Sequence, residues 1–133
     1  MATTVRILHL EDNPRDAELI NQRLRDANLS FEIVHVADRV GFESALKQAK
    51  FDLILSDFTL PDFDGLSAFT LARQTDRHIP FILVSGALGL EGALQALNLG
   101  ATDYVSKDNL CNLVPAIWAA LTLRLSAPTV SFT

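Results

Sequence analysis

The sequence predicts an α/β fold in which a five-stranded parallel sheet is flanked by helices on both faces. Two observations lead to this prediction. Short apolar runs alternate with amphipathic stretches, which is the pattern of strands and covering helices in a parallel sheet. Several of these apolar runs are followed directly by acidic or other polar residues, at the edge where open α/β sheets bind ligands.

The predicted strands are short runs rich in Val, Ile, Leu and Phe. They lie at about Val5 to Leu10, Phe31 to Val36, Phe51 to Asp57, Pro80 to Val84 and Asp103 to Val105. Helices are predicted at about Pro14 to Ala27, Val40 to Ala49, Leu66 to Gln74, Glu91 to Leu99 and Leu113 to Leu125. The first two helices carry an apolar face at helical spacing, formed by Ala17, Ile20, Leu24 and Ala27 and by Phe42, Ala45, Leu46 and Ala49.

Pro115 fixes where the last helix begins. A helix that started at Asn109 would hold this proline about two turns inside, where it removes a hydrogen bond and clashes with the preceding turn. A start near Leu113, with Asn112 as the cap, places Pro115 in the first turn, where proline is well tolerated. Residues 108–111 are then expected to form a separate short turn.

The composition indicates one globular domain. A chain of 133 residues with 49% hydrophobic residues can bury a single core, and no apolar run approaches the ~20 residues that span a bilayer. We expect residues 1–125 to form the domain and residues 126–133 to be a tail or the stub of a linker.

Charge and cysteine content exclude other classes. The N-terminus lacks the basic and apolar regions of a secretory signal, and Cys111 alone cannot form an internal disulfide or a multi-cysteine metal site, so a cytoplasmic protein is expected. The net charge of -5, without a cluster of Lys and Arg, argues against direct binding to nucleic acid.

Acidic residues follow two of the predicted strands. Glu11 and Asp12 come after the first strand and Asp57 closes the third. Since the carboxyl ends of neighbouring parallel strands lie side by side, these acids should converge in one crevice. Crowded carboxylates repel one another unless a cation holds them, and oxygen ligands of this kind suit a hard ion, so Mg2+ is expected.

Two further polar residues follow predicted strands, Ser85 after the fourth and Lys107 after the fifth. Each residue type has a role in phosphoryl transfer. Asp57 can act as a carboxylate nucleophile that forms an acyl phosphate, while the metal held by the acidic pair neutralises the phosphoryl oxygens. The Ser85 hydroxyl and the Lys107 ammonium can bind the remaining oxygens.

With these residues in this order, the chain resembles the receiver domain of two-component response regulators, a CheY-like, flavodoxin-like (βα)5 fold. The resemblance runs from about Val5 to Leu123. The matching residues are Glu11, Asp12, Asp57, Pro61, Asp64, Gly65, Ser85, Gly86, Ala87, Gly100, Ala101, Thr102, Asp103, Tyr104 and Lys107.

The resemblance implies that Asp57 receives a phosphoryl group from a histidine of a sensor kinase or a phosphotransfer protein. It implies metal ligation by Asp12, Asp57 and the backbone carbonyl of Thr59, with Glu11 acting mainly through water. It also implies that Ser85 and Tyr104 form a switch that phosphorylation biases. Such a domain is not an enzyme beyond its own phosphorylation and dephosphorylation.

One residue departs from the family pattern, and several others need a separate interpretation. Asp108 stands where many receivers have a proline, so a cis peptide after Lys107 is not expected. Thr59 and Ala87 are both small, which predicts that water reaches the acyl phosphate. His9, His35 and His78 lie on or next to strands without a second histidine at ligand spacing and are expected to be structural.

Other functions stay open. A pseudo-receiver would keep the fold purely as a binding module, although the complete set of acidic, hydroxyl and lysine residues argues against it. A phosphohydrolase with an aspartyl nucleophile commonly has a second Asp two residues later, where this chain has Thr59. A flavin-binding flavodoxin-like protein is disfavoured because Glu11 and Asp12 would repel the phosphate.

The last helix carries more apolar residues than one buried stripe requires. Leu113, Ile117, Leu121 and Leu125 can face the sheet, and Val114, Trp118 and Leu123 widen the apolar arc. Such an excess can mark an interface. We therefore hypothesise a homodimer or an output contact through this helix, against the alternative of a broad core-facing stripe with a few tolerated surface side chains.

Overall fold

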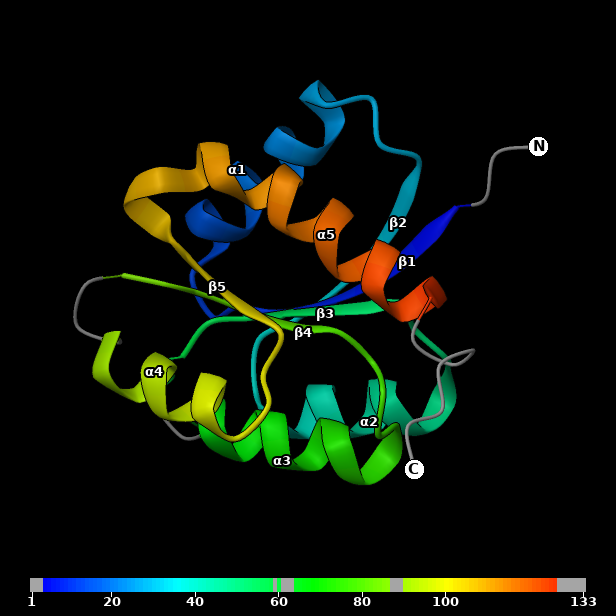
Figure 1. The fold of residues 1–133 in the computed structure, drawn as a ribbon, viewed down its shortest axis with the longest axis vertical. Coiled ribbons are helices and arrows are strands. Elements are labelled where there is room, and N and C mark those ends of the chain that lie inside the picture. The colour runs from blue at the N-terminus through cyan, green and yellow to red at the C-terminus, as the bar shows by residue number, and fades with distance from the viewer. Residues whose placement is uncertain (1–3, 59, 61–63, 87–89, 127–133) are drawn as a thin grey trace.

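The computed structural model describes residues 4–58, 60, 64–86 and 90–126, and they form one five-stranded parallel sheet between two layers of helices (Figure 1). The strands are β1 (Val5–Leu10), β2 (Phe31–Val36), β3 (Leu53–Ser56), β4 (Phe81–Ser85) and β5 (Asp103–Ser106). The helices are α1 (Pro14–Asp26), α2 (Arg39–Gln48), α3 (Gly65–Thr75), α4 (Leu90–Asn98), the 3-10 helix η2 (Lys107–Asn112) and α5 (Leu113–Ser126). The predicted fold class is confirmed.

The strand order β2-β1-β3-β4-β5 determines where a ligand can bind. The chain moves from β1 outward to β2 and then back across to β3, so the order reverses between β1 and β3. In open α/β sheets the crevice at such a reversal, outside the carboxyl ends of the strands, is the usual ligand site. Glu11 and Asp12 follow β1 and Asp57 follows β3, so the reversal places the predicted acids at this crevice.

Two hydrophobic cores hold the helices against the sheet. The helices α1 and α5 cover one face and α2, α3 and α4 cover the other (Figure 1). On the first face Ile20 and Ile117 are fully buried, and on the second face Phe42 and Phe81 are fully buried. Every residue of β3 and β4 is buried, because an interior parallel strand is covered on both faces. Each helix in the described ranges is too short or too polar to span a membrane.

The end of α1 differs from the prediction by one residue. Ala27, expected on the buried face, is the exposed C-cap residue of this helix. Asn28 follows it with φ 56°, a left-handed conformation that stops a helix and that Asn adopts more readily than most residues. The predicted periodicity is right for Ile20 and Leu24, which are fully buried.

The segment before α5 follows the prediction closely. The separate turn expected at residues 108–111 is the 3-10 helix η2, one residue longer at each end, and Asn109 inside it has non-helical φ and ψ angles of -135° and 55°. The helix α5 begins at Leu113, so Pro115 lies in its first turn as expected. The described part of the chain contains no cis peptide bond, in agreement with the prediction for the bond after Lys107.

The ring of Phe58 is packed between two glycines that belong to different helices. A Cβ atom on Gly65, the first residue of α3, would lie 2.6 Å from Phe58 Cδ1 and 2.8 Å from Phe58 Cα. A Cβ atom on Gly92, in the first turn of α4, would lie 2.0 Å from Phe58 Cε2 and 2.1 Å from Phe58 Cζ. Both glycines therefore permit an approach to the ring that no other residue type allows.

Candidate functional site

The sheet itself positions the two buried acids of the site. The backbone N–H of Glu11 donates to the carbonyl of Val36 over 2.9 Å, and the N–H of Asp57 donates to the carbonyl of Leu10 over the same distance. The hydrogen bonds of the sheet therefore continue one residue past the carboxyl ends of β1 and β3. Both acidic residues are held by backbone contacts to neighbouring strands.

Glu11, Asp12 and Asp57 form one acidic cluster. Each offers a carboxylate oxygen, and these oxygens all lie within 4.8 Å of one another. Glu11 and Asp57 are buried, with 0% and 5% of their surface exposed, whereas Asp12 is exposed. Three oxygen ligands at this spacing, open to solvent on one side, match the preference of Mg2+ for a few carboxylates and several waters.

Lys107, the first residue of η2, extends into this cluster. Its Nζ donates hydrogen bonds to Asp57 Oδ2 over 3.2 Å and to Asp16 Oδ2 over 2.8 Å. Glu11 Oε1 also lies 2.8 Å from Nζ, within ion-pair distance. One ammonium group is thus shared among three carboxylates.

The Glu11 carboxylate is only partly compensated by these contacts. Its Oε2 accepts from the backbone N–H of Asn13 over 3.2 Å, and Oε1 is paired with the Lys107 ammonium over 2.8 Å. Burial raises the pKa of Glu11 to about 7, although Lys107 acts in the opposite direction. A buried carboxylate whose oxygens lie within 4.8 Å of those of two other acids fits a metal ion.

The same environment favours the charged form of Lys107. Burial lowers the pKa of Lys107, but hydrogen bonds and charge from Asp16, Glu11 and Asp57 outweigh burial, so its pKa is raised above the ordinary value. The lysine therefore keeps its positive charge throughout the physiological range. It can act as a fixed cation for an anionic group that approaches Asp57.

Asp16 is the contact that our sequence reasoning missed. It lies in the first turn of α1, and its backbone N–H donates to the side chain of the capping residue Asn13. An acidic residue in a first helical turn commonly stabilises the helix dipole, so its type and place carried no signal of a contact with Lys107. The contact depends on where the lysine side chain extends.

Ser85 and Tyr104 belong to β4 and β5, which lie on the other side of β3 from β1. Ser56 pairs with Leu83 in the register of β3 and β4, so Ser85, which ends β4, lies one residue beyond the level of Asp57. Ser85 is 1% exposed, and the Tyr104 hydroxyl donates to its backbone carbonyl over 3.4 Å. The predicted positions of Thr59 and Ala87 lie outside the described residues.

Two histidines occupy the sheet face below α1, next to the acidic cluster. His9 and His35 are register partners on β1 and β2, with ring centroids 5.7 Å apart, and they line a cavity of about 160 Å3. Burial, followed by the charges of His35 and Lys107, lowers the pKa of His9 to about 3. His9 is therefore a neutral, buried residue.

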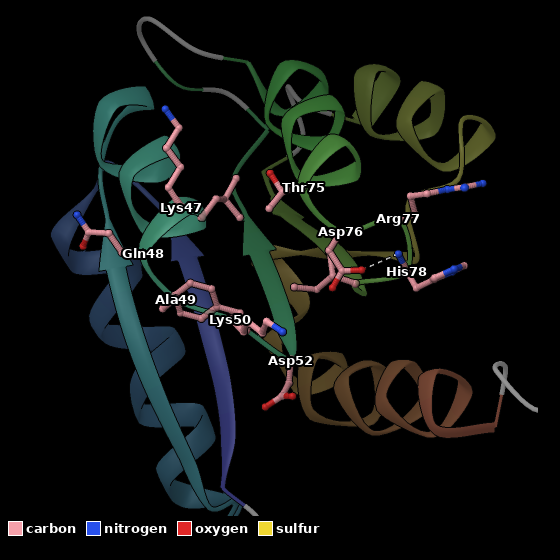
Figure 2. Close-up of a pocket in the computed structure, with 12 residues that line it drawn as sticks. Lys47, Gln48, Ala49, Lys50, Asp52, Thr75, Asp76, Arg77 and His78 are labelled. Carbon is pink, nitrogen blue, oxygen red and sulfur yellow. Dashed lines mark hydrogen bonds between the residues drawn. The ribbon is translucent and has the colours of Figure 1, made fainter.

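A larger groove of about 860 Å3 lies on the opposite edge of the sheet (Figure 2). It is lined by the ends of α2 and α3 and by the residues that lead into β3 and β4, including Lys47, Lys50, Asp76 and Arg77. This is the edge where β3 and β4 begin, whereas Asp57 follows the end of β3. The groove is therefore separate from the acidic cluster and contains none of the predicted site residues.

Comparison with known proteins identifies close likenesses in sequence and fold. The family model of the response regulator receiver domain matches residues 7–117. The transcriptional regulatory protein BaeR of Escherichia coli is 36% identical over 106 residues, which are 78% of this chain and 42% of that protein. A protein-glutamate methylesterase/protein-glutamine glutaminase of Trichodesmium erythraeum is 35% identical over 105 residues, 77% of this chain and 30% of that protein.

Solved structures give the same result. The receiver domain of a sensor histidine kinase from Pseudomonas aeruginosa, solved with a magnesium ion coordinated in its active site cleft, has a TM-score of 0.77 and 27% identity. The likeness covers 90% of this chain and 99% of that domain. A CheY-like receiver domain protein from Methanospirillum hungatei has a TM-score of 0.80 and 26% identity, covering 94% and 99% of the two chains. The chain spans less than half the length of the curated relatives quoted above.

Proposed function

We propose, because the chain belongs to the response regulator receiver domain family, that it is a phosphoacceptor in a two-component or phosphorelay system. Asp57 is the acceptor. The observation that carries this proposal is the arrangement around Asp57, a buried carboxylate beside Glu11 and Asp12 and hydrogen-bonded to Lys107. The phosphoryl donor is a histidine of a sensor kinase or of a phosphotransfer protein.

The Asp57 carboxylate supplies the nucleophile in this reaction. One of its oxygens attacks phosphorus, an O–P bond forms, and the P–N bond to the donor imidazole breaks. Asp12, Asp57 and the carbonyl of Thr59 would hold Mg2+ with help from Glu11, and the ion supplies positive charge to the phosphoryl oxygens. The carboxylate oxygens lie within 4.8 Å of one another, which suits a shared ion.

Lys107 and Ser85 complete the binding of the phosphoryl group. The Lys107 ammonium, 3.2 Å from Asp57 Oδ2, provides a charge for one phosphoryl oxygen, and the Ser85 hydroxyl provides a hydrogen bond to another. The Tyr104 hydroxyl already contacts the Ser85 carbonyl. A shift of Ser85 toward the phosphoryl group would therefore change the contact that holds Tyr104, which gives the switch a physical link.

The surface that passes the signal on includes α5. Trp118 on this helix is 52% exposed, although its neighbour Ile117 is fully buried. An exposed tryptophan next to a buried stripe supports a contact with a second copy of the chain or with an output partner. Light scattering of the phosphorylated and unphosphorylated protein tests the homodimer, and a monomer in both states would exclude it.

Intact mass measurement tests the proposed function directly. The protein is incubated briefly with a small phosphodonor, with and without Mg2+, beside Asp57→Asn. We expect a single phosphoryl adduct that requires Mg2+ and is absent from the variant. If no adduct forms and beryllofluoride with Mg2+ also fails to bind, the chain is a pseudo-receiver that acts only as a binding module.

A further inference from the structure

We propose that Asp16 is a positioning residue that holds the Lys107 ammonium at the phosphoacceptor site. This inference rests on the proposed function. The Asp16 Oδ2 atom lies 2.8 Å from Lys107 Nζ, closer than the 3.2 Å that separates Nζ from Asp57 Oδ2. Asp16 is thus closer to the lysine than the phosphoacceptor itself, at the same distance as Glu11.

Asp16 is itself held in place by the start of α1. The side chain of Asn13 accepts from the backbone N–H groups of Arg15 and Asp16, over 2.9 and 3.3 Å. Pro14 occupies the first position of the helix, where its fixed φ angle suits the helical backbone. A capped first turn fixes the backbone from which the short Asp16 side chain extends. The carboxylate is therefore attached to a part of the helix that is itself held in place.

Lys107 needs such a partner because its own side chain is flexible. Four rotatable bonds separate the ammonium from the backbone, and ordering a lysine side chain costs about 1.5–2 kcal/mol of conformational entropy. Its side chain is 19% exposed, so solvent can reach it. The ammonium must be held near Asp57 before the phosphoryl group arrives.

The other two carboxylates cannot hold the lysine throughout the reaction. Glu11 and Asp57 belong to the acidic cluster that fits a metal, so a bound cation attracts the same oxygens that face Lys107. Asp57 then bonds to phosphorus. Asp16 is outside that cluster and keeps its contact with Lys107 in every step. It also faces the lysine from α1, on a different element from either acid.

Variants at Asp16 separate a positioning role from a simple helix-dipole effect. Asp16→Ala removes the contact, whereas Asp16→Asn keeps an oxygen that can accept from Nζ. Glu18→Ala is the matched control, because Glu18 is an exposed acid of the same helix without a contact to Lys107. A dipole effect would depend on charge in the first turn and would treat the Ala and Asn variants alike.

The first measurement is the rate of Asp57 adduct formation at saturating Mg2+. We expect Asp16→Ala to lower the rate roughly tenfold, the size of a lost charge-assisted hydrogen bond, and Asp16→Asn to recover most of it. Glu18→Ala should match the wild type. In a Lys107→Ala background, Asp16→Ala should have no further effect. An unchanged rate in Asp16→Ala, or an equal loss without the lysine, would overturn the inference.

The second measurement follows the lysine without any phosphoryl transfer. The chain has three lysines, and Lys47 and Lys50 are exposed, so 15N-lysine NMR should show a protected ammonium signal from Lys107 alone. With Mg2+ bound, we expect this signal in the wild type and in Asp16→Asn, and its loss in Asp16→Ala. If the signal persists in Asp16→Ala, the positioning role is wrong. If the signals behave as expected while the wild type accepts no phosphoryl group, only the proposed function fails.

Discussion

Replacing Gly92 by alanine tests the packing of Phe58 between two helices. The new Cβ would lie 2.0 Å from Phe58 Cε2 and 2.1 Å from Phe58 Cζ. Carbon atoms in contact are ordinarily about 3.5–4.0 Å apart, so the ring and α4 must separate by about 1.5 Å. The ring cannot simply move away, because Gly65 lies against Phe58 Cα and Cδ1 on its other side.

Two opposing terms set the size of the effect. Overpacking of this kind costs about 1–3 kcal/mol, whereas alanine is favoured over glycine inside a helix by about 1 kcal/mol. We therefore expect Gly92→Ala to lower the free energy of unfolding by up to about 2 kcal/mol in the wild type. In a Phe58→Ala background the overlap is absent, so the same substitution should stabilise the protein by up to about 1 kcal/mol.

Urea unfolding of the wild type, the two single variants and the double variant measures this change from destabilisation to stabilisation. The expected interaction free energy between the two positions is about 1–3 kcal/mol. Gly86→Ala is the control, because a Cβ there meets nothing within 4 Å. An interaction free energy below about 0.5 kcal/mol would show that Phe58 does not restrain α4 and would refute the reasoning.

Three further predictions concern the acidic cluster and its surroundings. Because burial raises the pKa of Glu11 to about 7, Mg2+ must displace a proton at pH 6 but not at pH 8. Calorimetric titration should therefore show an affinity for Mg2+ that increases from pH 6 to pH 8, and this increase should be smaller in Glu11→Gln. The same pH dependence in both proteins would contradict the prediction. Because burial lowers the pKa of His9 from 6.5 to about 3, the unfolded chain takes up a proton first as the pH falls, so the free energy of unfolding should decrease between these values. This is measured by urea unfolding in a Glu11→Gln background, which removes the opposing titration of Glu11. Acidification should lower the free energy of unfolding more in this protein than in the same protein with His9→Leu, and equal decreases would exclude this account. Asn13→Ala removes the cap of α1 and should lower the free energy of unfolding by about 1 kcal/mol. It should also weaken the NMR signal of the Lys107 ammonium. A change in stability alone would mean that Asp16 keeps its place without the cap.

The central residues of the site could be predicted because their positions follow from strand order alone. Glu11, Asp57 and Lys107 each come directly after a strand, and parallel strands bring their carboxyl ends to one edge. No side-chain direction has to be known to reach that conclusion. The start of α5 was predictable for a similar reason, since Pro115 forbids most of the alternative boundaries.

The contacts that the sequence did not predict depend on side-chain directions and tertiary packing. Asp16 lies on a helix, and only the path of the Lys107 side chain makes it part of the site. The glycine at position 92 carries no local signal of its purpose, because the ring that requires it belongs to Phe58 on a distant segment. Ala27 was wrongly expected on the buried face because Asn28 adopts a left-handed conformation that ends α1, which the apolar spacing of the helix does not encode.

The sheet order has a consequence for how rigidly the two charges of the site are held. Glu11 and Asp57 follow β1 and β3, which have a hydrogen-bonded neighbour on each side, whereas Lys107 follows β5, which has a neighbour on one side only. In native-state hydrogen exchange, interior strands open with nearly the full free energy of unfolding, while edge elements open locally at lower free energy. The amides of β1 and β3 should therefore exchange much more slowly than those of β5 and η2. On this expectation the anionic half of the site belongs to the interior of the sheet, whereas its cationic half follows an edge strand that opens at lower free energy.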